Sequence, residues 1–308
     1  MKKKINWETM SYGGQAVMDG VMIKSKNFIS VSVRNEKNKI VNETYKFNNF
    51  LSKYAFWKVP FFRGVANMAE MLVVGMTALT KSINMHLDEE EEKLSPLHMF
   101  FTILVSMGIA LVFFKLLPWV SANFIKNLLN INSNFFTNCI DAFLKILILI
   151  IYILVISLFS DIKHLFMYHG AEHKSVHCWE KYKNFKNLNI INTQKFKTLH
   201  PRCGTSFLLF VVFTSLVVYL LIPIQFGLWQ NFGIRLLLLP LIVGLSYEFL
   251  KITAKHEHTW IMRALMQPGL LMQKLTTSSP TDDQAEVAIH SLKHAINAQK
   301  KFEEKNSA

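Results

Sequence analysis

A histidine–glutamate motif, H-G-A-E-H, occupies His169 to His173. Its H-x-x-E-H spacing is that of a group of zinc peptidases. Residues four apart on a helix share one face, so the imidazoles of His169 and His173 can bind the same metal ion. Glu172 lies on that face and can take a proton from a water that the metal acidifies. The motif therefore predicts a site for Zn²⁺ or another divalent cation, with Glu172 as the catalytic base rather than a ligand.

Three residues are candidates for the third metal ligand, because catalytic zinc usually has three protein ligands and one open position. Cys203 is a soft ligand, and His200 precedes it by three residues in the motif H-P-R-C. Glu248 lies inside an apolar segment, where a carboxylate is costly and marks either function or a paired charge. A buried thiol is the structural alternative for Cys203, and a salt bridge to a nearby lysine is the alternative for Glu248. The sequence leaves the choice open.

A second group of residues predicts substrate or lipid-headgroup binding more weakly. Three arginines lie at the ends of apolar segments, where they can anchor the chain or bind a phosphate or carboxylate. A glycine-rich stretch near the N-terminus allows close backbone approach to a ligand, although a plain turn explains it equally well. These residues are Arg63, Arg202, Arg263, Gly13, Gly14, Gln15 and Asp19.

Four apolar segments are long enough to cross a bilayer, which takes about 20 residues. Over half of the chain is apolar (51%), as expected for a membrane protein. Pro240 should kink the fourth segment, while Lys145 and Arg235 are expected to extend from segment ends to the interface. The segments are His98–Leu117, Ala142–Ser160, Ser206–Phe226 and Phe232–Thr253.

Four crossings place both termini and the 161–205 loop, with the histidine motif, on the same side of the membrane. Lys126 is the one Lys or Arg in the two connections on the other side. The positive-inside rule then predicts a multi-pass protein of the cytoplasmic (bacterial inner) membrane with both termini cytosolic. This topology and contact with anionic lipid headgroups account for the net charge of +13. We therefore expect a lipid bilayer as partner and no nucleic acid; the sequence does not define an oligomeric state.

The expected fold is mainly helical, with four domains or segments. Residues 1–58 form an N-terminal cytosolic cap with a β-hairpin of Phe28–Arg34 and Ile40–Phe47. Residues 59–95 form an interfacial helix and an acidic linker, and residues 96–255 form the membrane domain, whose second span continues as a helix into the histidine motif. Residues 256–308 form a cytosolic C-terminal segment with a break at Pro268–Gly269 and a capped final helix.

Several motifs together resemble the YqhQ-like family of bacterial membrane proteins, whose members are described as predicted metal-dependent enzymes. The resemblance spans almost the whole chain and implies a membrane topology and a suspected metal site, without a known substrate. Asp19 stands where the family's first motif usually has Glu, so a carboxylate is kept. The motifs are G-G-Q-A-V-M-D-G-V-M from Gly13, P-F-F-R-G from Pro60, H-G-A-E-H-K from His169, H-P-R-C-G-T-S-F from His200, and R-A-L-M-Q-P-G-L with Q-K-L-T-T from Arg263 to Thr277.

The leading hypothesis is a membrane-embedded, zinc-dependent hydrolase acting on a peptide, an amide or a lipid headgroup. One alternative is a non-catalytic scaffold in which a metal ion or a histidine cluster holds the cytosolic loop to the helices. Another is a metal or solute transporter. A transporter would need more polar residues deep inside the spans than the sequence indicates, so it ranks last.

Overall fold

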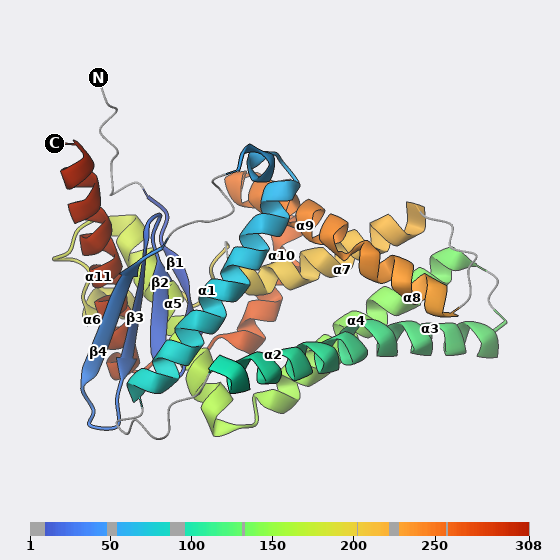
Figure 1. The fold of residues 1–308 in the computed structure, drawn as a ribbon, viewed down its shortest axis with the longest axis horizontal. Coiled ribbons are helices and arrows are strands. Elements are labelled where there is room, and N and C mark those ends of the chain that lie inside the picture. The colour runs from blue at the N-terminus through green and yellow to red at the C-terminus, as the bar shows by residue number, and fades with distance from the viewer. Residues whose placement is uncertain are drawn as a thin grey trace.

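The computed structural model describes residues 10–47, 54–86, 96–130, 133–201, 203–221, 228–256 and 258–307. The chain is mainly helical and has a small antiparallel sheet near the N-terminus, as the sequence predicts (Figure 1). The helices are η3 (Ala55–Lys58), α1 (Phe62–His86), α2 (Pro96–Leu111), η5 (Val112–Leu116), α3 (Leu117–Leu128), α4 (Asn134–Ile156), α5 (Ser160–Tyr182), α6 (Ile190–Gln194), α7 (Gly204–Leu221), α8 (Leu228–Leu237), α9 (Leu239–Lys255), α10 (Trp260–Thr276) and α11 (Asp282–Ser307).

The sheet is a meander of four strands in the order β1-β2-β3-β4: β1 (Gly13–Val17), β2 (Gly20–Lys24), β3 (Phe28–Arg34) and β4 (Ile40–Lys46). The predicted hairpin of the last two strands is confirmed. The glycine-rich stretch, expected to be a turn or a ligand loop, instead forms the first hairpin. A two-residue turn joins Val17 to Gly20, and Asp19 adopts a positive φ of 47° there, which Asp tolerates better than most residues.

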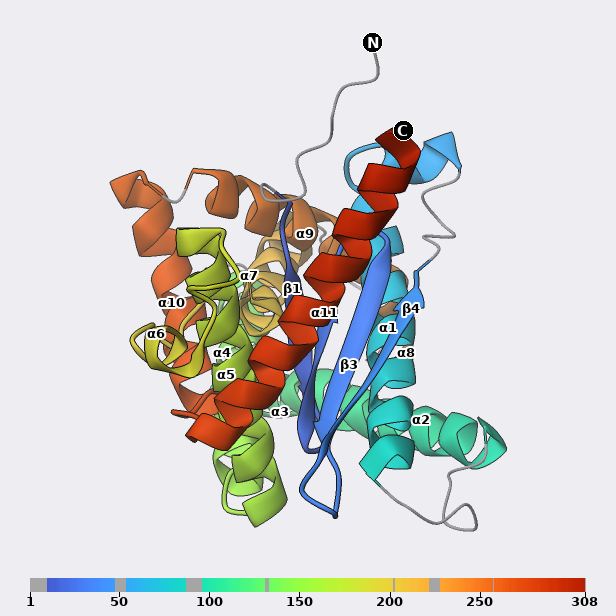
Figure 2. The ribbon, with the colours of Figure 1, turned by 90° about the vertical axis from the view of Figure 1, so that its left-hand side faces the viewer.

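Both faces of the sheet are covered. Val21 and Ile23 face the core formed with α5 and α11, whereas Met22 faces Val74 and Ala78 of α1. This alternation follows from the two-residue period of a strand. Helix α11 crosses one face of the sheet diagonally, with α5 beside it (Figure 2). The N-terminal strands and the C-terminal helix therefore belong to one layered unit that also contains α5.

Within the described residues, three helices are long and apolar enough to cross a membrane, and a fourth crossing is complete if a bent pair is counted as one span. The bent pair is α8 and α9, which meet at 42° next to Pro240, so the expected kink is confirmed. The first span is longer than predicted. It runs from Phe100 to Leu128 through the π-helical turn η5, so residues 118–128 are helical and not a loop.

Three further expectations prove wrong. The histidine motif does not continue the second span, because α4 ends at Ile156 and α5 begins at Ser160. Helix α10 passes through Pro268 without a break; it packs on α7, where Gly269 lies directly against Ser206. Lys145 and Arg235 do not extend to an interface but are buried, with 6% and 7% exposure.

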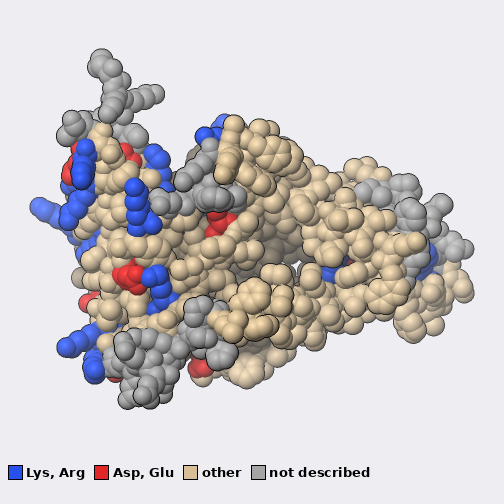
Figure 3. Space-filling model, in the orientation of Figure 1, with Lys and Arg blue, Asp and Glu red and all other residues tan. Residues whose placement is uncertain are grey.

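Charge is distributed unevenly over the molecule. Lys and Arg gather over the part that contains the sheet, and the surface of the long apolar helices is almost uncharged (Figure 3). Many large hydrophobic side chains on α2, η5 and α4 are exposed. This pattern is compatible with a membrane protein whose sheet and α11 lie outside the bilayer.

Candidate functional site

Helix α5 carries the histidine motif and is held closely against the chain segment between α10 and α11. A Cβ atom on Gly170 would lie 2.0 Å from the backbone oxygen of Ser278, so only glycine permits this contact. The amide of Ser278 in turn donates to the carbonyl of Phe166 (2.9 Å). The glycine of H-G-A-E-H therefore lets the segment pass next to His169.

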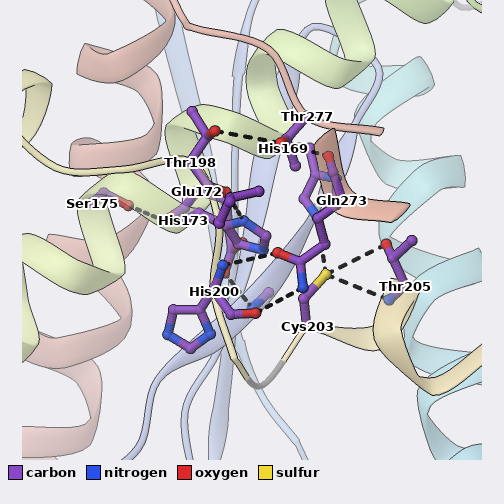
Figure 4. Close-up of polar contacts among 12 residues, drawn as sticks. His169, Glu172, His173, Ser175, Thr198, His200, Cys203, Thr205, Gln273 and Thr277 are labelled. Atoms are coloured by element: carbon purple, nitrogen blue, oxygen red, sulfur yellow. Dashed lines mark hydrogen bonds and ion pairs between the residues drawn. The ribbon is translucent and has the colours of Figure 1, made fainter. Parts of the chain in front are cut away.

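His169 and His173 are each oriented by a backbone carbonyl. Nδ1 of His169 donates to Thr276 O at 2.9 Å, and Nδ1 of His173 donates to Thr198 O. Because Nδ1 carries the proton in each ring, Nε2 has a free lone pair and can bind a metal ion. A hydrogen bond at one ring nitrogen commonly selects the tautomer of a metal-binding histidine in this way. Nε2 of His169 lies 3.4 Å from Sγ of Cys203. One ligand atom from each of His169, His173 and Cys203 lies within 4.8 Å of the other two, and the three side chains converge (Figure 4).

The segment that supplies Cys203 is fixed by Gln273 of α10. The Gln273 side chain is fully buried; it accepts from the amide of His200 and donates to the His200 carbonyl and to Ser206 Oγ, each at 2.8 Å. Sγ of Cys203 also accepts from the amide of Thr205 at 3.4 Å. Both Cys203 and the start of α7 are thereby held opposite α5.

Glu172 is buried (4% exposed) and bridges the sheet and the histidines. Its Oε1 accepts from the amide of Gly14 at 2.9 Å, and its Oε2 lies 3.4 Å from Nε2 of His173. Burial raises the pKa of Glu172 above its usual range, although His169, His200 and the Gly14 amide oppose the shift. A cation bound at the three ligands would lower this pKa in turn. The carboxylate of Glu172 therefore lies next to the potential ligand atoms of His169, His173 and Cys203, in the position that a catalytic base would need.

These residues line a pocket of about 880 Å³, between the start of β1, α5 and the start of α7. Its walls combine backbone of Gly13 and Gly14 with apolar side chains such as Phe166 and with two lysines, Lys24 and Lys26. Burial lowers the pKa of the Lys24 ammonium group below its usual range. The volume of the pocket gives room for a substrate of moderate size directly over Glu172.

His200 belongs to a second group of potential ligands, with His177 and Glu180. Its Nε2 lies 3.6 Å from Glu180 Oε2, and its ring is 4.6 Å from that of His177 and 5.5 Å from that of His173. The sequence analysis missed His177. Its spacing of four residues from His173 was the signal, because it extends the same face of α5 by one turn.

The structure places Glu248 in a different interaction. Its two oxygens accept from Arg63 Nε at 2.6 Å and Arg63 Nη2 at 2.5 Å, and Oε1 also accepts from the amide of Phe61. Arg63 thus neutralises a carboxylate on α9, and neither residue joins the histidine group. The predicted salt bridge of Glu248 exists, but with an arginine of α1.

Of the remaining residues predicted to bind a substrate or headgroup, some line the pocket and others lie away from it. Gly13, Gly14 and Gln15 line the pocket, and Gln15 donates to Gly75 O on α1 at 3.0 Å. Asp19 lies in the β1–β2 turn, 3.4 Å from His86. Arg263 is on α10, outside the lining of the pocket. Arg202 lies outside the described residues.

Long apolar helices and a pocket of His, Cys and Glu side chains define a mainly helical protein with a polar site at one end of its helices, and the length of these helices is compatible with a membrane protein. Residues 59–298 match the family described as "Protein of unknown function (DUF1385)", and the chain belongs to this family. It is 34% identical over 303 residues to "Uncharacterized protein YqhQ" of Bacillus subtilis (strain 168), covering 93% of this chain and 92% of that protein. The resemblance drawn from the motifs is thereby confirmed. No solved structure matches the chain.

Proposed function

We propose that the protein is a multi-pass enzyme of the cytoplasmic membrane, a metal-dependent hydrolase whose site faces the cytosol. One observation carries the proposal: His169, His173 and Cys203 converge within 4.8 Å, and the carboxylate of Glu172 lies next to them. The asymmetry of Lys and Arg supports the cytosolic placement of both termini and of the site.

The residues present fit a zinc ion. Two imidazoles and a thiolate are ligands that zinc prefers, and three protein ligands leave one position for water or substrate. A zinc ion at this position would lower the pKa of a bound water and polarise a substrate carbonyl. Backbone carbonyls hold both imidazoles, which limits the reorganisation that binding requires.

Glu172 is the proposed base. The amide of Gly14 donates to Oε1 of Glu172, and Oε2 lies next to His173. At that position Oε2 can accept a proton from a water on the proposed metal and return it to a leaving group. Burial raises the pKa of this carboxyl above its usual range, which makes it a stronger proton acceptor. The substrate, a peptide, an amide or a lipid headgroup, would enter the pocket beside the start of α7.

Elemental analysis of purified protein tests this proposal. The wild type should contain zinc or another divalent metal, and His173→Ala should lose one metal ion per chain. His164→Ala is a matched control, because His164 is on the same helix but exposed and outside both ligand groups. A wild type without bound metal, or a His173→Ala variant with unchanged metal content, would refute the metal site.

A further inference from the structure

A cluster of charged side chains is buried at the other end of the apolar helices from the histidine site. Asp141 and Lys145 of α4 have 1% and 6% exposure, and Arg235 of α8 has 7%. Lys115 of η5 approaches them, and Tyr219 of α7 (2% exposed) lies at their centre. Three separate elements thus bring charges together around a tyrosine of a fourth, within otherwise apolar surroundings.

Within the described residues, Asp141 is the carboxylate that pairs with these cations, and it compensates them only in part. Its Oδ2 accepts from Lys145 Nζ at 2.6 Å and from Arg235 Nη1 at 2.8 Å. Among the described residues, Asp141 Oδ1 and Arg235 Nε are buried and have no hydrogen-bond partner. Lys115 has a neutral partner instead, the Tyr219 hydroxyl at 2.6 Å.

The cluster therefore has three cations and one carboxylate. Asp141 is the only acidic residue in the sequence from Pro96 to Ser160 and from Gly204 to Tyr247. The ring of Tyr219 faces all three cations, with distances of 5.1, 5.4 and 4.4 Å from Lys115, Lys145 and Arg235. Such cation–π contacts offset a part of the charge, but an uncompensated cation in an apolar layer remains unfavourable. An anion is the missing component.

One edge of the cluster reaches the surface, because Lys115 is only half-buried. Asp141 and Lys145 lie seven and eleven residues from the start of α4, about 10 and 17 Å along the helix. A ligand from the adjacent bilayer leaflet can therefore reach the cluster.

We infer that Lys115, Lys145 and Arg235 bind an oxyanion of the phosphate class, presented by an anionic phospholipid. The planar guanidinium of Arg235 and the two ammonium groups match the donors that phosphates prefer. Asn138 holds Arg235 through its Oδ1 at 2.7 Å, so the guanidinium is oriented before the ligand binds. This site is independent of the proposed hydrolase centre, and it supplies the polar groups inside the apolar helices that the sequence analysis did not find.

Thermal unfolding in a neutral detergent tests this inference with three additives: phosphatidylglycerol, inorganic phosphate and uncharged diacylglycerol. Phosphatidylglycerol should raise the Tm of the wild type by about 3 °C or more, because a ligand stabilises the state it binds. In Lys115→Met this increase should fall by at least half. The hydrogen bond of Lys115 goes to Tyr219, so this variant leaves the ion pairs of Asp141 with Lys145 and Arg235 in place. Lys126→Met, half-buried on the following helix, is the control and should respond as the wild type.

The additives distinguish the sources of the anion. A shift with inorganic phosphate that Lys115→Met abolishes would support the site and identify a free anion as its ligand. The absence of any shift in the wild type, or equal shifts in all three proteins, would overturn the inference. Phosphorus content of the protein purified without added lipid gives a second readout, and it should be lower in Lys115→Met than in Lys126→Met.

Discussion

At the scale of single residues, the hydrogen bond from Gly14 to Glu172 joins positions 158 residues apart. It connects the glycine-rich motif of the first strand with the histidine motif of α5. A backbone amide gives Glu172 a fixed partner without adding a charge, so the carboxylate keeps its capacity to accept a proton. The two motifs therefore serve one site.

Replacing Glu172 by Gln removes the proton acceptor but preserves size and polarity. We expect metal content close to that of the wild type and a loss of function of about a hundredfold or more, the usual scale for a general base. Metal analysis and complementation of a strain that lacks the protein measure the two effects. Loss of metal in Glu172→Gln would make Glu172 a ligand, and full function with retained metal would favour a scaffold over an enzyme.

Gly14 and Gly13 form a matched pair for substitution by Ala. A Cβ atom on Gly14 would lie 1.8 Å from the backbone oxygen of Met22, whereas one on Gly13 would have nothing within 4 Å. Gly14→Ala must push β1 away from β2, so it should destabilise the protein by about 2 kcal/mol or more. Gly13→Ala should unfold at a temperature close to the wild type in the same scan. Equal melting temperatures for both variants would contradict the close packing of these strands.

At the scale of elements, α10 positions the segment between His200 and Ser206. Gln273 binds both backbone groups of His200 and the hydroxyl of Ser206, so one side chain holds the start of α7. The uninterrupted passage of α10 through Pro268 brings Gln273 into this position. A helix ending at Pro268 would leave the thiol of Cys203 without this support.

Gln273→Met should therefore affect stability and metal binding together. The substitution removes the three hydrogen bonds that Gln273 makes to buried groups of His200 and Ser206, and a buried group left unsatisfied costs about 1–3 kcal/mol. We expect a lower melting temperature and a metal affinity reduced about tenfold or more, on the scale seen when groups that orient ligands are lost. Lys274→Met is the control, because Lys274 is adjacent but exposed. A Gln273→Met variant with wild-type metal affinity would exclude the proposed role of α10.

At the scale of the whole molecule, the sheet, α5 and α11 form one unit at one end of the apolar helices. Core residues from β2, α5 and α11 pack together, among them Val21, Trp179 and Leu292. The C-terminal helix therefore completes the core on which the histidine helix rests. The sequence alone does not show the packing of α11 on the N-terminal strands, because the two are far apart in the chain.

The charge asymmetry predicts the side of the membrane on which this unit lies. A reporter that is active only in the cytosol should give signal when fused to the C-terminus and none when fused after Asn130, which follows α3. The physical reason is the excess of Lys and Arg at the end that contains the sheet. The reverse pattern would place the pocket outside the cytosol, while leaving its internal geometry unchanged.

The sequence by itself determined the local structure. Apolar length identified the helices that are long enough to cross a membrane, and Pro240 identified the kink, because each depends on residues close together in the chain. The alternation in residues 28–47 identified β3 and β4 for the same reason. The spacing of His169 and His173 also placed both imidazoles on one face of a helix.

Only the tertiary structure decided which distant residues meet. Cys203, His200 and Glu248 were equal candidates in the sequence, and the packing of α10 and α1 separated them: Gln273 holds the segment next to Cys203, and Arg63 pairs with Glu248. The pairing of Asp141 with Lys145, four residues on in the same helix, is local, but only the tertiary structure brings Arg235 to the same carboxylate. Position along a helix does not specify the neighbouring helix, so the charges that meet inside the bundle depend on long-range packing.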